Sequence, residues 1–111
     1  MTPAERDVVE RLLEYPFEGH DDLRRQVENA LVRPVDEGFS LEVRVNGPAV
    51  HSVPARVPVE AETRDSDGAT VHVLLHVVDG RVNELELYRE DLARVQAFPS
   101  AANLTVLRGD W

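Results

Sequence analysis

Two histidines, His72 and His76, stand four residues apart, a spacing that resembles a metal site. On a helix this spacing places both imidazoles on one face, where they can chelate zinc. The residues around them alternate between apolar and polar types, however, which predicts a strand. Side chains four positions apart on a strand are separated by about 13 Å, at about 3.3 Å per residue, and cannot share one ion. The alternative is a site that joins one of these histidines to Glu84, Glu86 or a glutamate of a neighbouring strand, but we expect surface histidines, with no bound metal and no other cofactor.

Two further groups of side chains resemble sites, and each has a structural explanation. His20 precedes Asp21 and Asp22, and carboxylates beside an imidazole suggest metal or proton chemistry. We interpret the two aspartates as helix caps. The run Asp65-Ser66-Asp67-Gly68 resembles the start of a calcium loop, but the twelfth position, which requires a glutamate, is His76. We expect a turn at this run.

The segment from Val71 to Arg89 predicts two antiparallel strands that fold back on each other around Val78-Asp79-Gly80. Apolar side chains occupy every second position of the first strand, namely Val71, Val73, Leu75 and Val77, so one face of this strand is apolar.

The length of the loop decides which side chains share that apolar face. A two-residue Asp79-Gly80 loop would place Glu84 and Glu86 on it, which is unfavourable. We predict a three-residue loop with Gly80 in the left-handed conformation. The resulting cross-strand pairs are Val73 with Leu85, Val71 with Leu87, and His72 with Glu86. The last pair has the composition of an acid–base pair, but opposite charges across strands also stabilise sheets.

Helical patterns occupy the N-terminal third of the chain. Thr2 is expected to be an N-cap, with Pro3 at the first helical position and Glu5 completing a capping box, and Pro16 ends this helix. Its core-facing side chains are Val8, Val9, Leu12 and Leu13. A second helix is expected to begin at Asp21 or Asp22 and to run to about Leu31, before Pro34. Its core-facing side chains are Leu23, Val27, Ala30 and Leu31.

The remaining strands follow from the same alternation of apolar and polar residues. Strands are predicted over residues 39–45 and 57–64, and from Thr70 onward. Residues 49–56, which include Pro54, predict an irregular crossing or an edge. Residues 92–97 suggest a helical turn, and residues 104–107 suggest a last short strand. The order of elements predicts a single α+β domain over residues 1–111, in which two N-terminal helices pack on one face of a mainly antiparallel sheet of four to six strands.

The segment VLLHVVDGRVNELELYRED, residues 73–91, resembles a family of small bacterial proteins described only as a domain of unknown function. In that family a strand ending in HVVDG pairs with a strand similar to ELEIY. The resemblance extends more loosely to the N-terminal helices and to VPVEAE at residues 57–62. It implies a fold and no activity, because the matched residues are ones that a hairpin requires.

Composition excludes several classes of function. Cys and Lys are both absent, which excludes disulfides, thiolate metal sites, Schiff-base catalysis and a phosphate-binding P-loop. The net charge of -9 repels nucleic acids and anionic membranes, and it favours basic partners. Use of Arg and Val in place of Lys and Ile is typical of a GC-rich, bacterial genome. The chain has no apolar run of about 20 residues and no signal-peptide pattern at its start, so we expect a cytoplasmic protein.

The open face of the predicted sheet is the candidate site, because Leu74 among charges resembles an interface anchor. Our first hypothesis is a non-enzymatic module whose acidic face binds a protein partner, such as a basic one, as an immunity protein binds a toxin. The candidate binding residues are Glu42, Glu60, Glu62, His72, Leu74, His76, Glu84, Glu86 and Tyr88, with Arg44 and Arg64 on the same face. One alternative is a small ligand-binding or catalytic domain, with a cleft where the helices meet the sheet edge and His72 or His20 as proton carrier. Another is a plain homodimer.

Overall fold

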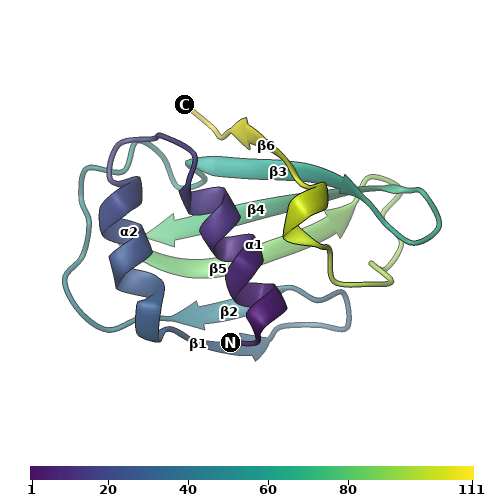
Figure 1. Cartoon of the computed structure of the whole chain (residues 1–111), viewed down its shortest axis with the longest axis horizontal. Coiled ribbons are helices and arrows are strands. Elements are labelled where there is room, and N and C mark those ends of the chain that lie inside the picture. Colours follow the sequence, from purple (N-terminus) through teal and green to yellow (C-terminus); the bar gives the residue numbers. More distant parts are fainter.

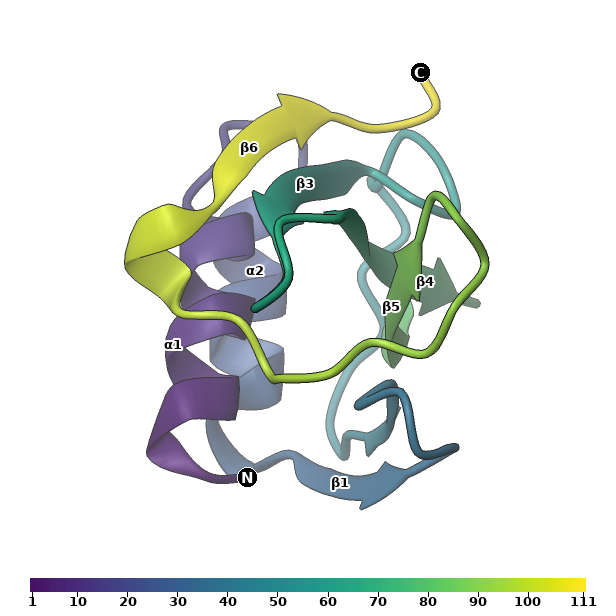
Figure 2. The same ribbon diagram turned by 90° about the vertical axis from the view of Figure 1, so that its right-hand side faces the viewer.

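A computed structural model describes all 111 residues. Two helices lie on one face of a six-stranded sheet whose neighbouring strands are all antiparallel, in the order β1-β2-β5-β4-β3-β6 (Figure 1). The elements are α1 (Pro3–Leu13), α2 (His20–Gln26), η1 (Val27–Asn29), β1 (Leu31–Pro34), β2 (Leu41–Arg44), β3 (Val59–Arg64), β4 (Thr70–Val78), β5 (Arg81–Arg89), η2 (Ala101–Asn103) and β6 (Thr105–Arg108). The sheet curves around the helices, which occupy its concave side (Figure 2). The predicted α+β architecture is confirmed.

Helix α1 begins as its sequence predicts. The hydroxyl of Thr2 accepts a hydrogen bond from the amide of Glu5, and the Glu5 carboxylate accepts one from the amide of Thr2. This capping box satisfies amide groups that the first turn leaves without partners. The four predicted core residues, Val8, Val9, Leu12 and Leu13, are buried against the sheet.

Helix α2 differs from the prediction at both ends. Its N-cap is Gly19, with φ of 91°, and Asp21 and Asp22 lie inside the first turn without capping it. Asp22 instead forms an ion pair with Arg25, one turn along the helix. The helix ends at Gln26, and after η1 the backbone becomes extended at Ala30. Leu31 therefore belongs to edge strand β1 and is 67% exposed, so its predicted place in the core is wrong.

The β4–β5 hairpin has the predicted faces but a different register. Its loop is the two residues Asp79 and Gly80, with φ of 51° and 75°, as in a type I′ turn. A bulge at Asn83 then adds one residue to β5, because Val77 pairs with Val82 while the preceding residue of β4 pairs with Glu84.

A two-residue loop alone would turn the apolar side chains of β5 to the outer side of the sheet, and the bulge turns them back. The turn and the bulge together stand in place of the predicted three-residue loop. Three observed pairs differ from the predicted ones by two positions: Val73 pairs with Leu87, Val71 with Arg89, and His72 with Tyr88. The predicted pairs with Leu85, Leu87 and Glu86 are therefore wrong. The odd-numbered side chains of residues 71–77 are nevertheless buried together with Leu85 and Leu87, as predicted.

The chain between β2 and β3 crosses the turn end of this hairpin, because the two strands lie on opposite sides of it. The crossing is irregular over residues 49–56, as predicted. The amide of Val50 donates to the carbonyl of Gly80 at 2.8 Å, and the side chain of Gln26 binds Gly80 and Val82. A Cβ atom on Gly80 would lie 2.7 Å from the Val50 nitrogen, so this turn requires glycine for its close approach as well as for its φ.

Two loop predictions are corrected, and the last strand is confirmed. Phe39 has φ of 71° and lies before β2 with its side chain exposed, instead of facing the core from a strand. Residues 92–97 form no helical turn, because the chain leaves β5 and runs across the end of the sheet to reach η2 beside α1 (Figure 2). The predicted strand at residues 104–107 is β6, which pairs with β3. No helix combines the length and the hydropathy that crossing a bilayer requires.

Candidate functional site

The convex face of the sheet, which points away from the helices, carries all nine predicted site residues. We call this surface the outer face. Cross-strand pairing arranges it in rows: Glu42 with Glu84 and then His76, Glu86 with Leu74 and then Glu60, and Tyr88 with His72 and then Glu62. Arg44 and Arg64 lie at its margins, on β2 and β3. The structure thus brings the predicted residues together.

Leu74 lies at the centre of the outer face and is partly exposed. Glu60 and Glu86 are its direct neighbours on β3 and β5, and side chains paired in this way have Cβ atoms about 4.5 to 5.5 Å apart. Leu107 lies beyond Glu60 on β6. An apolar side chain is therefore enclosed by two carboxylates within the sheet, which is the arrangement of an anchor with a charged rim.

His72 has a different partner from the one predicted. Its ring stacks on the ring of Tyr88, with centroids 5.0 Å apart and planes 24° apart. Its Nε2 lies 2.8 Å from Oε1 of Glu90, which follows the end of β5. The predicted pair with Glu86 is absent because the register differs by two positions. Glu90 was missed for the same reason, since only the correct register places it beside His72.

His76 contacts Glu86, the carboxylate that the predicted register placed opposite His72. Its Nε2 lies 2.8 Å from Oε1 of Glu86, and Nε of Arg56 donates to its Nδ1 at 3.2 Å. In this geometry Nδ1 accepts from Arg56, which leaves Nε2 to donate to Glu86. Arg56 comes from the irregular crossing, and no sequence pattern relates it to His76. The two imidazoles point to different carboxylates, and no three metal-binding side chains converge anywhere in the chain.

Carboxylates outnumber cations on the outer face. Glu42 and Glu84 stand directly opposite each other on β2 and β5, a like-charge pair that destabilises a sheet. Arg33 binds Glu42 at 2.5 Å, whereas Glu60, Glu62 and Glu84 form no ion pair.

The phenol of Tyr88 responds to this excess of negative charge. Its partial burial raises the pKa of Tyr88, and the charges of Glu60, Glu86 and Glu90 raise it further. Both effects disfavour the phenolate, and the second follows from the three carboxylates that lie near the phenol.

A buried ion cluster lies at one end of the sheet. Arg89 is 5% exposed, and its guanidinium binds Asp65 at 3.1 Å, Asp67 at 2.9 Å and Asp91 at 2.5 Å. The predicted turn at residues 65–68 is therefore confirmed, and its aspartates bind an arginine. The backbone amide of Gln96 also donates to Asp65. The cluster joins the β3–β4 turn to the segment after β5, and its role is structural.

Charge pairing shifts the pKa values of this cluster. Burial raises the pKa of Asp65, but hydrogen bonds from the amides of Gln96 and Ser66 and from Arg89 outweigh it, so the pKa is lowered overall. Hydrogen bonds from Arg89 and from the amide of Ala93 lower the pKa of Asp91 to about 2. The same carboxylates raise the pKa of Arg89. All three groups are therefore charged in the folded chain at neutral pH.

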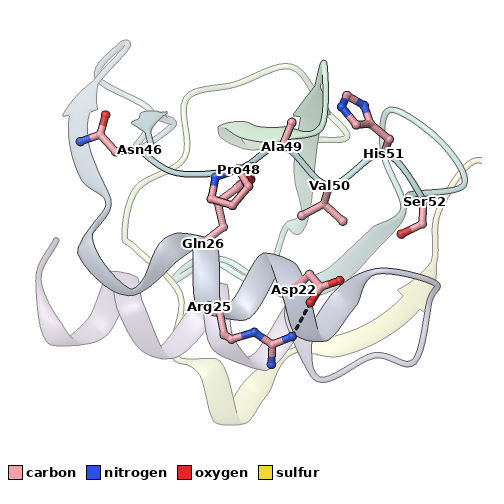
Figure 3. Close-up of a pocket in the computed structure, with 9 residues that line it drawn as sticks. All are labelled: Asp22, Arg25, Gln26, Asn46, Pro48, Ala49, Val50, His51 and Ser52. Carbon is pink, nitrogen blue, oxygen red and sulfur yellow. Dashed lines mark hydrogen bonds and ion pairs between the residues drawn. The ribbon is translucent and has the colours of Figure 1, made fainter.

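A cleft of about 630 Å³ lies between α2 and the crossing (Figure 3). Asp22 and Arg25 form an ion pair on one wall, and the amide of Gln26 is occupied by backbone groups of Pro48, Gly80 and Val82. His51 points away from the cleft (Figure 3). The remaining lining residues are Asn46, Ala49, Val50 and Ser52.

Neither of the histidines that were considered as proton carriers lines this cleft. His72 is on the outer face, and Nδ1 of His20 lies 2.8 Å from the carbonyl of Leu13, where it ties α2 to α1. In this cleft the charges of Asp22 and Arg25 therefore neutralise each other, and the side-chain amide of Gln26 already has hydrogen-bond partners. The outer face, where Glu60, Glu62 and Glu84 form no ion pair, has the greater capacity to bind.

Comparison with known proteins adds a family and no activity. A family model described as "Domain of unknown function (DUF6984)" matches residues 1–99, which extend from α1 through β5 and end before η2 and β6. No curated protein and no solved structure matches the chain.

Proposed function

Because the chain belongs to the DUF6984 family, whose description states no activity, we propose a function from the geometry of the chain itself. The outer face of the sheet binds a basic segment of another protein, and the module has no catalytic role. Neutralising a basic toxin, as immunity proteins do, is one role that such a surface would suit.

The observation that carries this proposal is the group of carboxylates without a cation partner. Glu60, Glu62 and Glu84 lie on β3 and β5, on either side of β4, and the like-charge pair of Glu84 with Glu42 makes the free chain less stable. A cationic side chain placed between these carboxylates would relieve that repulsion. Arginine suits such a position, because its planar guanidinium binds carboxylates through two parallel hydrogen bonds.

Leu74 supplies an apolar contact at the centre of the same surface. In such a surface the apolar contact at the centre contributes most of the affinity, and the charged residues of the rim orient the partner. The net charge of -9 would also accelerate the approach of a basic partner, since long-range attraction raises association rates. The proposal therefore predicts binding that weakens as salt concentration rises.

An oligo-arginine peptide is the simplest probe of this surface, with affinity measured by calorimetry at low ionic strength. The double variant Glu60→Gln with Glu84→Gln should weaken binding about tenfold, which corresponds to about 1.4 kcal/mol. The control is Glu10→Gln with Glu14→Gln, which removes the same charge from exposed positions of α1 and its C-cap. Equal losses in the two double variants would mean that only net charge attracts the peptide, and would refute the outer face as the site.

A second measurement tests the apolar contact. Leu74→Ser keeps every charge of the outer face and removes its central apolar side chain. Amide chemical shifts should show the peptide over β3, β4 and β5 in the unaltered protein. Shift changes confined to other surfaces would contradict the proposal.

A further inference from the structure

Four exposed apolar side chains belong to two segments that lie at the same end of the molecule. Val35 is 55% exposed, Phe39 38%, Tyr88 40% and Leu92 88%. They come from the β1–β2 turn and from the end of β5 with the segment after it, which lie together at the right-hand end of Figure 1. We call these four residues the corner patch. Tyr88 and Leu92 line one hollow there, and residues 36–38 of the turn between Val35 and Phe39 form its other wall. Exposed apolar side chains that gather in this way among polar residues are typical of interaction sites.

Several contacts hold the two segments of the corner patch together. The hydroxyl of Ser40 binds both the amide and the carbonyl of Leu87, at 2.9 and 3.2 Å. Arg94 forms an ion pair with Glu37 at 2.6 Å. A hollow of about 370 Å³ between the segments is lined by residues of both, including Tyr88 and Leu92. The patch is therefore a defined surface with a concave part.

The backbone of the corner patch is strained at two of its four residues. Phe39 has φ of 71° and Leu92 has φ of 64°. Large side chains rarely adopt this left-handed conformation, which glycine and asparagine tolerate better. Both side chains also expose apolar surface to water, so each residue is unfavourable to the isolated chain in two ways.

The surrounding contacts nevertheless maintain the strained position of Leu92. Its amide donates to the carbonyl of Arg89 at 3.1 Å, and the adjacent Asp91 is held by the Arg89 guanidinium and by the amide of Ala93. Strain that neighbouring contacts maintain in this way is concentrated at functional sites in proteins. The strain and the exposure together indicate that Leu92 has a role outside the fold.

We propose that the corner patch is an anchor site for apolar side chains of a protein segment whose adjacent residues are basic. The inference rests on the proposed function, since it names a second contact for the same partner. Tyr88 belongs to both the outer face and the corner patch, so a bound segment can pass from one to the other. Asp36, Glu37 and Glu90 belong to the same two segments. Glu37 is paired with Arg94 and Glu90 contacts His72, whereas Asp36 forms no ion pair. These acidic residues favour a basic partner.

Two peptides separate this inference from the proposed function. Both contain the same run of arginines, and one ends in leucines while the other ends in serines. The leucine peptide should bind more tightly, by about fivefold, and Leu92→Asn should abolish this difference without weakening the serine peptide. Leu31→Asn is the control, because Leu31 is also exposed and apolar but lies on β1, outside the patch.

Stability provides an independent readout of the same variant. Because asparagine tolerates the left-handed conformation, Leu92→Asn should unfold at a higher urea concentration than the unaltered protein. Loss of the leucine-dependent affinity together with increased stability would support a role in binding rather than in folding. An unchanged leucine-dependent affinity in Leu92→Asn would overturn the inference.

The remaining outcomes are also decisive. If the Glu60 and Glu84 variants leave both peptides unaffected while Leu92→Asn still removes the leucine-dependent gain, the outer-face proposal fails and the corner patch remains as a separate site. If sedimentation shows self-association that Leu92→Asn abolishes, the patch binds a second copy of the chain, and the inference of a basic partner is wrong.

Discussion

The guanidinium of Arg89, at the end of β5, donates a hydrogen bond to the carboxylate of Asp65 in the β3–β4 turn, with Nη1 and Oδ2 3.1 Å apart. The side chain of Asp65 is fully buried, and that of Arg89 is 5% exposed. Removing one member of a buried pair leaves a charge without compensation. The pair therefore makes the end of the sheet, and the segment that carries Leu92, dependent on the ionisation of carboxylates.

Acid should weaken the fold through this cluster. A carboxyl group whose pKa is lower in the folded than in the unfolded chain stabilises the fold above its unfolded pKa, and this contribution is lost as the pH falls through the folded pKa. For Asp91 these values are 3.8 and about 2, and the pKa of Asp65 is also lowered. The urea midpoint should therefore fall between about pH 4 and pH 2. Asp91→Asn should reduce this dependence, and equal slopes in both proteins would contradict the assignment.

Replacing Gly80 with alanine should destabilise the protein more than replacing Gly68, a glycine that also has a positive φ. Gly68→Ala introduces a left-handed alanine where no atom lies within 4 Å, and should cost about 1 kcal/mol in the free energy of unfolding. Gly80→Ala should cost about 1 to 3 kcal/mol more, because its Cβ would meet Val50 of the crossing. Urea unfolding of the two variants measures the difference. Similar losses would show that the crossing does not depend on close approach at this turn.

Deletion of Asn83 should be tolerated. This residue is the extra one in the bulge, so without it β5 can keep all of its cross-strand pairs and the same buried face. The free energy of unfolding should change by no more than about 1 kcal/mol. Deletion of Glu86 should unfold the chain, because it turns Leu87 and Arg89 from the inner to the outer face. Circular dichroism distinguishes these outcomes, and an unfolded Asn83 deletion would refute the observed register.

Glu84→Gln should stabilise the free protein while it weakens peptide binding. Removing one charge of the pair with Glu42 should add about 0.5 kcal/mol to the free energy of unfolding at low salt, and less at high salt. Glu62→Gln is the matched control, because Glu62 pairs with His72 and Thr105 and opposes no carboxylate. A gain in both variants would indicate an effect of net charge alone.

The sequence by itself determined which side chains are buried in α1 and in the β4–β5 hairpin, although it misplaced Leu31. The capping box at Thr2 and Glu5, the apolar stripe of α1 and the inward side chains of β4 all follow from spacing along one segment. Such patterns are local, since a period of two or of 3.6 residues assigns faces wherever the segment lies. For the same reason, the nine predicted site residues were correctly grouped on one face, although their role in binding stays a prediction.

Only the tertiary structure decided which of these residues meet. A three-residue loop and a two-residue turn followed by a bulge give the same faces beyond the bulge, so alternation could not distinguish them, yet every cross-strand pair beyond the bulge differs by two positions. Because of that difference, His72 contacts Glu90 and His76 contacts Glu86. Arg56, the Arg89 cluster and the corner patch join segments far apart in the chain. Their contacts depend on how the crossing and the segment after β5 pack at the two ends of the sheet, which no local pattern encodes.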